Sequence, residues 1–400
     1  MQPLDTKCNA LQSIIKKYRP NFEPYESIYR ELHSAPELSG QEKETSSLVA
    51  SHLQKHNFEV HSNIGGYGVA GVLKNGNGPT VLLRADMDAL PLQEKTNLPY
   101  ASHRTVKNKV GMNVPVMHGC GHDTHVTAMM GAAELLSSAK DTWSGTLLII
   151  FQPSEEELSG AQAMIADGLY DKIPKPDVAL AQHVMRMKSG TVAIRPGRLL
   201  TATDAFDINI HGRGGHGSSP QACIDPIVIG ASIIMRLQSI VSREITPGEL
   251  AIVSCGSIQA GHVANVIPDT CEIKLSVRSY DPKTRERLNS AIKRIVEAEC
   301  AASGAPKRPD IKHTVTATAT VNDEGSVKTL NSTFGSYFGS NLVETEPTTA
   351  SEDFSLLARE RLDEMPGNHS PFFAPVIQPT ILTAVDAMAL GALTLLGRVE

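Results

Sequence analysis

The 400-residue sequence has few cysteines, no long block of one charge and no long continuous apolar run. Its six cysteines are too few and too scattered for a disulfide framework, which favours a reducing compartment. The 37 basic and 43 acidic residues give a net charge of −6 and are interspersed along the chain. This balance argues against nucleic acid or an anionic membrane surface as the main partner.

Segments for export or membrane insertion are also missing. The first twenty residues lack the continuous apolar core of a secretory signal. The most apolar stretch, 381–397, is short for a bilayer and contains Asp386. We therefore expect a cytoplasmic protein with no membrane partner.

Several common catalytic signatures do not occur, among them H-E-x-x-H, G-x-x-x-x-G-K-[ST] and G-x-S-x-G. A formal G-x-G-x-x-G match exists at 212–217, but it follows an alternating strand pattern rather than a buried one. No clear acidic residue closes a βαβ unit after it. The match therefore does not indicate a dinucleotide site.

Length and composition predict a globular protein of about two to three domains at roughly 150 residues each. Before residue 200, the apolar runs 81–85, 146–151 and 178–182 predict strands that are buried on both faces. Apolar residues at helical spacing from Val126 to Ala133 predict a helix that begins near Asp123. This alternation predicts an α/β domain with a mainly parallel sheet.

The pattern changes near residue 202. Apolar residues alternate strictly with polar ones at 206–210 and 273–277, which is typical of strands with one solvated face. The order of elements from 203 to 317 predicts a β-α-β-β-α-β, ferredoxin-like arrangement. We therefore expect a discontinuous α/β domain, 1–202 and 318–400, with a small inserted domain at 203–317.

Polar side chains follow each of the three buried strands. The first strand is followed by Asp86 and Asp88, the second by Glu155 and Glu156, and the third by His183. Ligands bind beyond the carboxyl ends of strands in open α/β sheets, so these side chains are expected to share one site. Taken singly, His183 fits a capping or core residue better than a ligand, and the paired glutamates fit a solvated loop. Asp86 and Asp88 fit turn or N-cap residues.

A second cluster, 118–125, opens the helix predicted near Asp123. Cys120 and His122 are separated only by a glycine, so both can reach one centre. Thiolate, imidazole and carboxylate together suit a borderline transition metal such as zinc, manganese, cobalt or nickel. Taken alone, Cys120 fits a small buried hydrophobe better than a ligand. His125, one turn later, is either a residue that supports a ligand or a surface residue.

Five motifs occur in one order, and together they resemble those of the M20 metallopeptidase family: 84–91, 117–125, 151–156, 214–217 and 351–354. The Cys-Gly-His form at 120–122 is similar to the amidohydrolase branch, which includes hippurate hydrolases and indole-3-acetyl-amino acid hydrolases. Weaker matches at 32–38 and 265–269 extend the resemblance over nearly the whole chain.

The resemblance implies a role for individual residues. It implies two divalent metal ions per subunit, manganese or zinc before cobalt or nickel, with ligands at Cys120, His122, Glu156, His183 and His369. It implies that Glu155 is the general base and that His216 holds the reacting carbonyl, often across a dimer interface. Asn265 matches a substrate-binding residue. The inserted domain would be a lid and dimerisation module, and the protein a homodimer.

Two segments depart from the family pattern. Relatives often have several glycines directly after the glutamate pair, whereas here 157–159 intervene before Gly160. After His369 this chain continues Ser-Pro-Phe-Phe-Ala, where relatives often have Ser-Pro-Arg-Phe-Asp. The departures leave the ligands in place and put substrate choice in doubt.

The sequence therefore predicts a metal-dependent amidohydrolase that cleaves small N-acyl or N-aroyl amino acids with a metal-activated water. Three other readings stay open. The protein could be an M20 carboxypeptidase or dipeptidase that acts on peptides. Cys120 could be a nucleophile activated by a histidine. The chain could also be a non-catalytic binding protein that keeps the fold.

Overall fold

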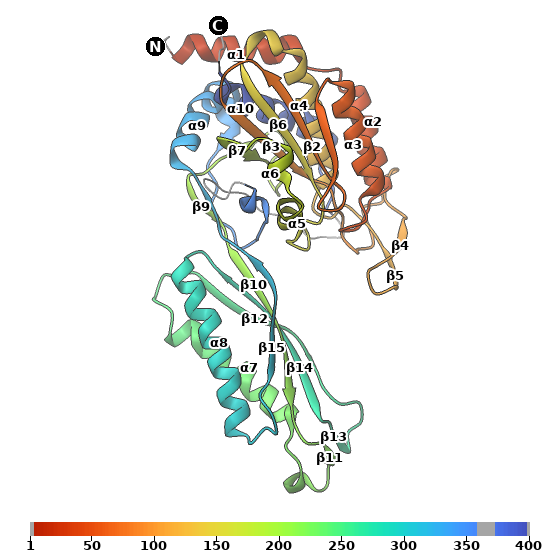
Figure 1. The fold of residues 1–400 in the computed structure, drawn as a ribbon, viewed down its shortest axis with the longest axis vertical. Helices are drawn as coiled ribbons and strands as arrows, with labels where there is room; N and C mark the ends of the chain where they lie inside the picture. The colour runs from red at the N-terminus through yellow and green to blue at the C-terminus, as the bar shows by residue number, and fades with distance from the viewer. Residues whose placement is uncertain (1–3, 358–372, 398–400) are drawn as a thin grey trace. The chain divides into compact units, whose positions relative to one another are not determined.

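The computed structural model describes residues 4–357 and 373–397. Its contacts divide the chain into two compact units (Figure 1). Unit 1 comprises Met1–Leu200 and Thr320–Glu400, and unit 2 comprises Thr201–Ala319. The segment 203–317 that the sequence marks as an insertion lies within unit 2.

Unit 1 is built on a five-stranded sheet with the order β1-β2-β6-β3-β7. The strands are β1 (Glu59–Ile64), β2 (Gly68–Asn75), β3 (Thr80–Asp86), β6 (Gly145–Gln152) and β7 (Val178–Ala181). β3 pairs in parallel with both β6 and β7, as the buried apolar runs predict. The mixed α/β class expected from the sequence is thereby confirmed.

The sheet is not mainly parallel, and that expectation is wrong for half of its pairings. β1 pairs antiparallel with β2, and β2 pairs antiparallel with β6. A tight turn at Gly65 and Gly66, both with positive φ, joins β1 to β2 and makes them run in opposite directions. The short connection 76–79 reverses the chain again before β3, and β6 then inserts between β2 and β3.

The central strands are buried on both faces. In β3, Val81 and Leu83 belong to one apolar core while Leu82 belongs to another. The same alternation occurs in β6, where Ile149 and Ile150 lie on opposite faces. A sheet covered on both sides leaves its strand ends as the place where polar side chains can meet.

Helices cover both faces of this sheet. Those of unit 1 are α1 (Leu4–Tyr18), α2 (Glu23–Ser34), α3 (Lys43–Lys55), α4 (His122–Ser138), α5 (Gly160–Ala166), α6 (Leu169–Lys172), α9 (Glu324–Phe338) and α10 (Ile377–Leu395). Short strands complete the unit: β4 (Thr105–Lys107) with β5 (Asn113–Pro115), β8 (Val192–Ala193) with β17 (Leu342–Val343), and β9 (Gly197–Leu200) with β16 (Thr320–Asn322).

α10 is long and apolar enough to cross a membrane by length and composition alone. Its residues from Ile381 to Leu393 nevertheless contribute to the main core of unit 1, together with residues of α4. The helix therefore reads as a core helix, and it is the one such segment found among the described residues.

Unit 2 contains a four-stranded antiparallel sheet with the order β12-β14-β10-β15. Its elements are β10 (Ala202–His211), β11 (Gly215–His216), α7 (Pro226–Arg243), β12 (Ala251–Gln259), β13 (Val266–Ile267), β14 (Thr270–Ser279), α8 (Pro282–Ala302) and β15 (Asp310–Ala317). Phe206, Ile208 and Ile210 point into a core shared with α7 and α8. The two helices begin after the side-chain caps Asp225 and Asp281.

Asp204 of β10 is a buried carboxylate in unit 2. It accepts hydrogen bonds from Arg285 Nε at 2.6 Å and Nη2 at 2.8 Å, and it lies 2.6 Å from Nε2 of His313. Burial alone would raise the pKa of Asp204, but the hydrogen bonds and charge of Arg285 outweigh burial and lower it. The group thus stabilises unit 2 in its ionised form.

Candidate metal centre

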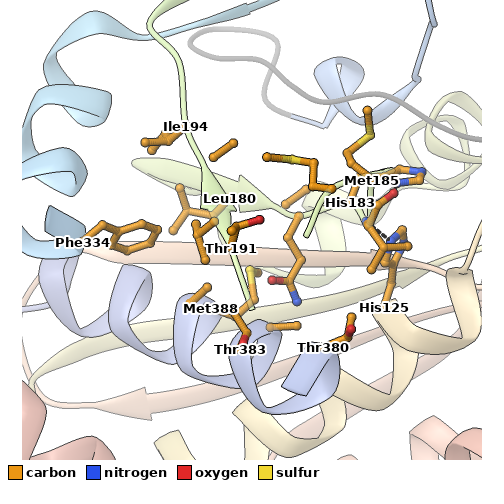
Figure 2. A pocket seen from close by; sticks show the side chains of 18 of the residues that line it. His125, Leu180, His183, Met185, Thr191, Ile194, Phe334, Thr380, Thr383 and Met388 are labelled. Carbon is orange, nitrogen blue, oxygen red and sulfur yellow. Dashed lines mark hydrogen bonds between the residues drawn. The ribbon is translucent and has the colours of Figure 1, made fainter. Parts of the chain in front are cut away.

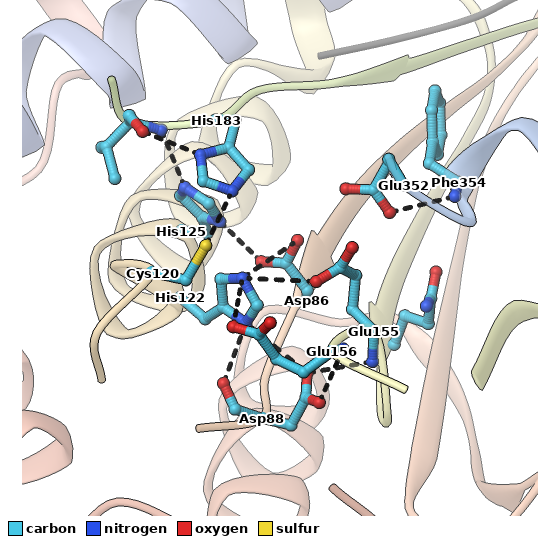
Figure 3. A network of polar contacts seen from close by, with 12 residues as sticks. Asp86, Asp88, Cys120, His122, His125, Glu155, Glu156, His183, Glu352 and Phe354 are labelled. Atoms are coloured by element: carbon cyan, nitrogen blue, oxygen red, sulfur yellow. Dashed lines mark hydrogen bonds and ion pairs between the residues drawn. The ribbon is translucent and has the colours of Figure 1, made fainter. Parts of the chain in front are cut away.

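Metal-ligating side chains gather where the central strands of unit 1 end (Figure 3). Asp86 ends β3, His122 opens α4, Glu155 follows β6, and His183 follows β7. Candidate ligands form four groups of three residues, and within each group the ligand atoms lie within 4.8 Å of one another. The groups are Cys120–His122–His183, Asp86–His122–His125, His122–Glu155–Glu156 and Asp86–Glu155–Glu352. His122 is common to three of these groups, so it marks the middle of the cluster.

Gly121 allows Cys120 and His122 to face the same centre. It has φ +83° at the N-cap of α4, a conformation that side chains of L-residues rarely adopt. A Cβ at this position would lie 2.4 Å from Cγ2 of Val184. The glycine therefore serves both the turn and the close approach of the segment that carries His183.

His122 is fully buried and presents one ring nitrogen to the cluster. Its Nδ1 donates to the carbonyl oxygen of Asp88 at 2.8 Å, so Nε2 carries the lone pair in the neutral ring. Nε2 has no hydrogen-bond partner among the described residues. It faces oxygens of Glu155 at 3.7 Å, Asp86 at 3.9 Å and Glu156 at 4.0 Å. A buried ring nitrogen that faces carboxylates favours a cation between them, either a proton or a metal ion.

His183 is held in the same tautomer. Its Nδ1 donates to the carbonyl oxygen of Val184 at 2.8 Å, and its Nε2 lies 3.4 Å from Sγ of Cys120. Burial and the neighbouring His125 and His122 lower the pKa of His183, so the ring is neutral. Ligating histidines in proteins commonly donate their second N–H to a carbonyl or carboxylate in this way.

Glu155 and Glu156 lie on a turn whose main-chain amides donate hydrogen bonds to the side chain of Asp88. The amides of Glu155 and Glu156 each donate to the Asp88 carboxylate at 3.0 Å, and Ser39 Oγ donates to it at 2.6 Å. Ser154, just before the pair, has φ +51°. The turn is therefore a local conformation that the surrounding hydrogen bonds maintain.

Burial and charge act strongly on this cluster. Burial raises the pKa of Glu155, and the charges of Glu352 and Glu156 raise it further. Burial would lower the pKa of His122, but the negative charges of Asp86 and Cys120 outweigh it and raise the pKa. Both shifts share one contribution, the buried negative charge of neighbouring groups, which a divalent cation would neutralise.

His125 lies close to the cluster but has both ring nitrogens engaged. Nε2 accepts from the amide of Val184 at 2.9 Å, so Nδ1 carries the proton and donates to Asp86 at 2.5 Å. No lone pair is left for a metal ion. His125 is a buried support for the His183 segment, which decides between the two readings that the sequence leaves open.

Arg84 is a fully buried cation in β3 beneath the cluster. It donates to Asp86 at 2.6 Å and to Glu352 at 2.8 and 3.2 Å. Its Nε donates to the side-chain oxygen of Gln152 at 2.9 Å. The side-chain amide nitrogen of Gln152 in turn donates to Asp353 at 2.6 Å. The motif at 351–354 is thereby joined to the ends of β3 and β6.

A divalent transition metal ion fits these residues. The cluster offers a thiol, two imidazole lone pairs and several carboxylates, all from buried or nearly buried side chains. Zinc, manganese, cobalt and nickel accept this mixture of donors, whereas calcium and magnesium prefer oxygen alone. The orphaned Nε2 of His122 supports the same conclusion.

The structure brings four of the five expected ligands together: Cys120, His122, Glu156 and His183. His369 lies outside the described residues. His216 and Asn265 belong to unit 2, where His216 pairs with Val266 and Gly217 donates to the carbonyl of Asn265 at 2.8 Å. These two candidate substrate residues are therefore close to each other, since His216 lies in β11 and Asn265 directly precedes β13.

Sequence reasoning assigned no role to Arg84 and Glu352, and it left Asp86 and Asp88 as unassigned strand-end carboxylates. A signal for them exists. An arginine inside an otherwise apolar strand that is buried on both faces requires carboxylate partners. Nothing local identifies Glu352 as that partner, because it lies 268 positions from Arg84.

Comparison with known proteins shows the family to which the chain belongs. The model of peptidase family M20/M25/M40 matches residues 82–373. The chain is 41% identical to the hippurate hydrolase of Campylobacter jejuni over 334 residues, which covers 82% of this chain and 84% of the relative. It is 39% identical to thermostable carboxypeptidase 1 of Saccharolobus solfataricus over 350 residues, 86% of this chain and 84% of the relative.

The fold also has solved counterparts. A dinuclear metal-binding peptidase of family M20 from Bacillus subtilis superposes with a TM-score of 0.75 at 28% identity, covering 94% of this chain and 98% of the other. The chain therefore belongs to peptidase family M20, and it is an enzyme of the metallo-amidohydrolase class. The resemblance noted in its motifs is confirmed.

Proposed function

We propose that this enzyme hydrolyses the amide bond of N-acyl or N-aroyl amino acids, with two divalent metal ions per subunit. The observation that carries the proposal is that carboxylate oxygens of Glu155 and Glu156 both lie near Nε2 of His122, at 3.7 and 4.0 Å. One carboxylate of such a pair can bind a metal ion while its neighbour transfers a proton. The 41% identity to a hippurate hydrolase supports the substrate class.

The metal ligands would be Cys120, His122, Glu156, His183 and His369, with manganese or zinc bound in preference to cobalt or nickel. Bound divalent ions supply Lewis acidity, which polarises the amide carbonyl and lowers the pKa of the attacking water. The chain fixes the orientation of its ligands, since backbone carbonyls hold the Nδ1 protons of His122 and His183.

Glu155 is the proposed general base. Its carboxylate takes the proton of the attacking water and then passes it to the nitrogen of the leaving amino acid. The surroundings suit both steps, because burial and neighbouring charges hold the pKa of Glu155 well above its usual range. A carboxylate with a raised pKa accepts a proton more readily than a solvated one.

His216 and Asn265 of unit 2 would bind the substrate. His216 is exposed, and its Nδ1 lies 2.8 Å from Oγ of Ser218, which orients the ring. In the proposed mechanism its second ring nitrogen donates to the carbonyl oxygen as negative charge develops there. One such donor contributes about 3–4 kcal/mol to transition-state stabilisation. Unit 2 would act as the lid.

Substitution of the base tests the mechanism. Glu155→Gln should keep bound metal, measured by elemental analysis, and lower kcat for hippurate by about 10²–10⁴. Glu157→Gln is the matched control, because Glu157 is exposed and pairs with Lys109. A Glu155→Gln enzyme with wild-type turnover would remove Glu155 from the mechanism.

A carboxypeptidase or dipeptidase is the second candidate, and the 39% identity to a thermostable carboxypeptidase favours it. The two functions differ in what lies on the acyl side of the scissile bond. Hydrolysis of hippurate and acetyl-amino acids well above that of dipeptides supports the first proposal. The reverse ranking supports the second.

Chelation separates the proposal from the two remaining readings. A metal hydrolase loses activity in EDTA and regains it with added Mn²⁺ or Zn²⁺, whereas a Cys120 nucleophile works without metal. A binding protein that keeps the fold shows no turnover on an acyl-amino acid panel even with metal added.

We also propose that unit 2 forms a homodimer. Val228 and Met235 of α7 are 65% and 74% exposed. The neighbouring strand β12 is an edge of its sheet and exposes Ile258. An apolar helix face beside an open edge suits a second copy of the same surface. Met235→Lys should turn a dimer into a monomer in analytical ultracentrifugation, and an unaltered sedimentation coefficient would contradict this interface.

A cytoplasmic location completes the proposal. The described structure forms no disulfide between its cysteines, which accords with a reducing compartment. Fractionation of cells that produce the protein is the direct test.

A further inference from the structure

A large cavity lies in unit 1 beside the metal centre (Figure 2). Its volume is about 440 Å³, within the range of pockets that bind small molecules. The segment 179–194, which continues from β7, forms one wall, and residues of α9 and α10 form the other. No step of the proposed mechanism uses this space.

The walls of the cavity are mostly apolar. Leu180, Ile194, Phe334 and Met388 supply the larger side chains. Polar residues are in the minority, and they include the hydroxyl groups of Thr191, Thr380 and Thr383. Such walls recognise a ligand by the apolar surface that it buries.

The cavity adjoins the candidate metal centre. His183 and His125 belong to its wall, and His183 is also a proposed ligand (Figure 2). Gln182, the residue before His183, lines the cavity too, and its Nε2 is buried without a hydrogen-bond partner among the described residues. The cavity is therefore the space beside the metal centre that one end of a bound substrate is closest to.

The charges on the two ends of the substrate decide which end enters the cavity. An amino acid product carries an α-carboxylate, and burial of an unpaired carboxylate among apolar side chains is very costly. Arg186 and Lys188, the two cations in the cavity wall, are both exposed. Asp323 also contributes to the wall and would repel a carboxylate, although its side chain caps α9 through Ser326. The acyl end of the substrate, which carries no charge, fits the cavity.

We infer that this cavity is the acyl-binding pocket, and that it selects an extended or bicyclic apolar acyl group of about eight carbon atoms or more over acetyl. The inference rests on the proposed amidohydrolase function and names its substrate class. A benzoyl group would fill only part of the volume. The pocket therefore predicts a preference for acyl groups larger than the benzoyl group of hippurate.

A chain-length series is the first test. Each buried methylene should raise kcat/KM roughly four-fold. The value for N-octanoyl amino acids should therefore exceed that for N-acetyl amino acids by at least about 100-fold. Equal or falling values along the series would overturn the inference.

A substitution that fills the cavity is the second test. Ala384 lies in the wall on α10, and Ala384→Phe should lower the octanoyl-to-acetyl ratio of kcat/KM by at least about 30-fold through loss of pocket volume. Ala166→Phe introduces the same side chain at an exposed position on α5 and should leave the ratio unchanged. An Ala384→Phe enzyme with the wild-type ratio contradicts the assignment.

Binding without metal gives an independent measurement, which also serves if Ala384→Phe does not fold. Octanamide should bind the EDTA-treated wild-type protein with a negative heat capacity change in calorimetry, because apolar surface is buried. Acetamide should not bind measurably. Absence of octanamide binding overturns the pocket.

These experiments separate the inference from the proposed function. If no acyl-amino acid is hydrolysed with metal present, the proposed function fails, whatever octanamide does. If acetyl-amino acids are hydrolysed best and octanamide does not bind, the function stands and the pocket assignment fails.

Discussion

Replacement of His125 by alanine should weaken metal binding although His125 is not a ligand. The ring is buried, donates to Asp86 at 2.5 Å and accepts from the amide of Val184 at 2.9 Å. The second bond holds the main chain directly after His183. Without it, the Nε2 of His183 loses its fixed position beside Cys120.

The size of the effect follows from the two hydrogen bonds. Each hydrogen bond is lost when the ring is removed, and the loss of such a bond from a buried group costs about 1–3 kcal/mol. Part of that cost falls on folding and part on the orientation of the ligands. Loss of partners that orient metal ligands typically lowers metal affinity by about 10–100-fold, or about 1.4–2.7 kcal/mol.

The assay is competition for Co²⁺ with a chelator of known affinity, read from the optical spectrum. The thiolate-to-cobalt absorption of Cys120 should persist in His125→Ala, since the ligand set is intact, while the affinity falls. His125→Gln should recover part of the affinity, because an amide side chain keeps one donor and one acceptor.

His61→Ala is the matched control, since His61 lies in the edge strand β1, outside the metal cluster. It should leave the cobalt affinity unchanged. Wild-type affinity in His125→Ala would refute the supporting role. Loss of the thiolate band would instead show that His125 belongs to the ligand set.

Three further changes test the scaffold. Gly121→Ala should destabilise the protein by more than about 1 kcal/mol in urea unfolding, because φ is +83° and Val184 lies 2.4 Å from the new Cβ; unchanged stability would contradict this packing. Arg84→Met should cost about 3–5 kcal/mol, since it leaves buried carboxylates without their cation, and a cost below 1 kcal/mol would contradict the network. Because its folded pKa is lowered, Asp204 stabilises unit 2 fully above its unfolded pKa of 3.8, and this contribution is lost as the pH falls toward the folded pKa. The stability of Asp204→Asn should therefore depend less on pH below about 4 than that of the wild type. Parallel curves of stability against pH would contradict the Arg285 pair.

The sequence predicts those parts of the fold that local pattern controls. Buried apolar runs correctly predict β3, β6 and β7, and the spacing of Val126 to Ala133 predicts α4 within one residue of its start. Strict alternation at 206–210 and 273–277 corresponds to β10 and β14. In each case the burial that shapes the element leaves a period in the sequence.

Strand direction and long-range pairing could not be predicted from the sequence. The antiparallel direction of β2 depends on the turn at Gly65–Gly66 and on the insertion of β6, not on the apolar residues of β2. The site shows the same limit. Strand ends predict Asp86, Glu155 and His183, but the bond between Arg84 and Glu352 joins residues whose local sequences carry no mutual signal.

The hydrogen bonds between Asp88 and the turn at 155–156 affect which substitutions the candidate site can accept. Asp88 binds the amide groups of the main chain, which are present whatever side chains stand at these positions. The shape of the turn is thus independent of the groups that carry the chemistry. With the roles proposed above for Glu155 and Glu156, substitutions there would alter metal preference or reaction type while the loop keeps its course, and this turn would be a starting point for new hydrolases on the same scaffold.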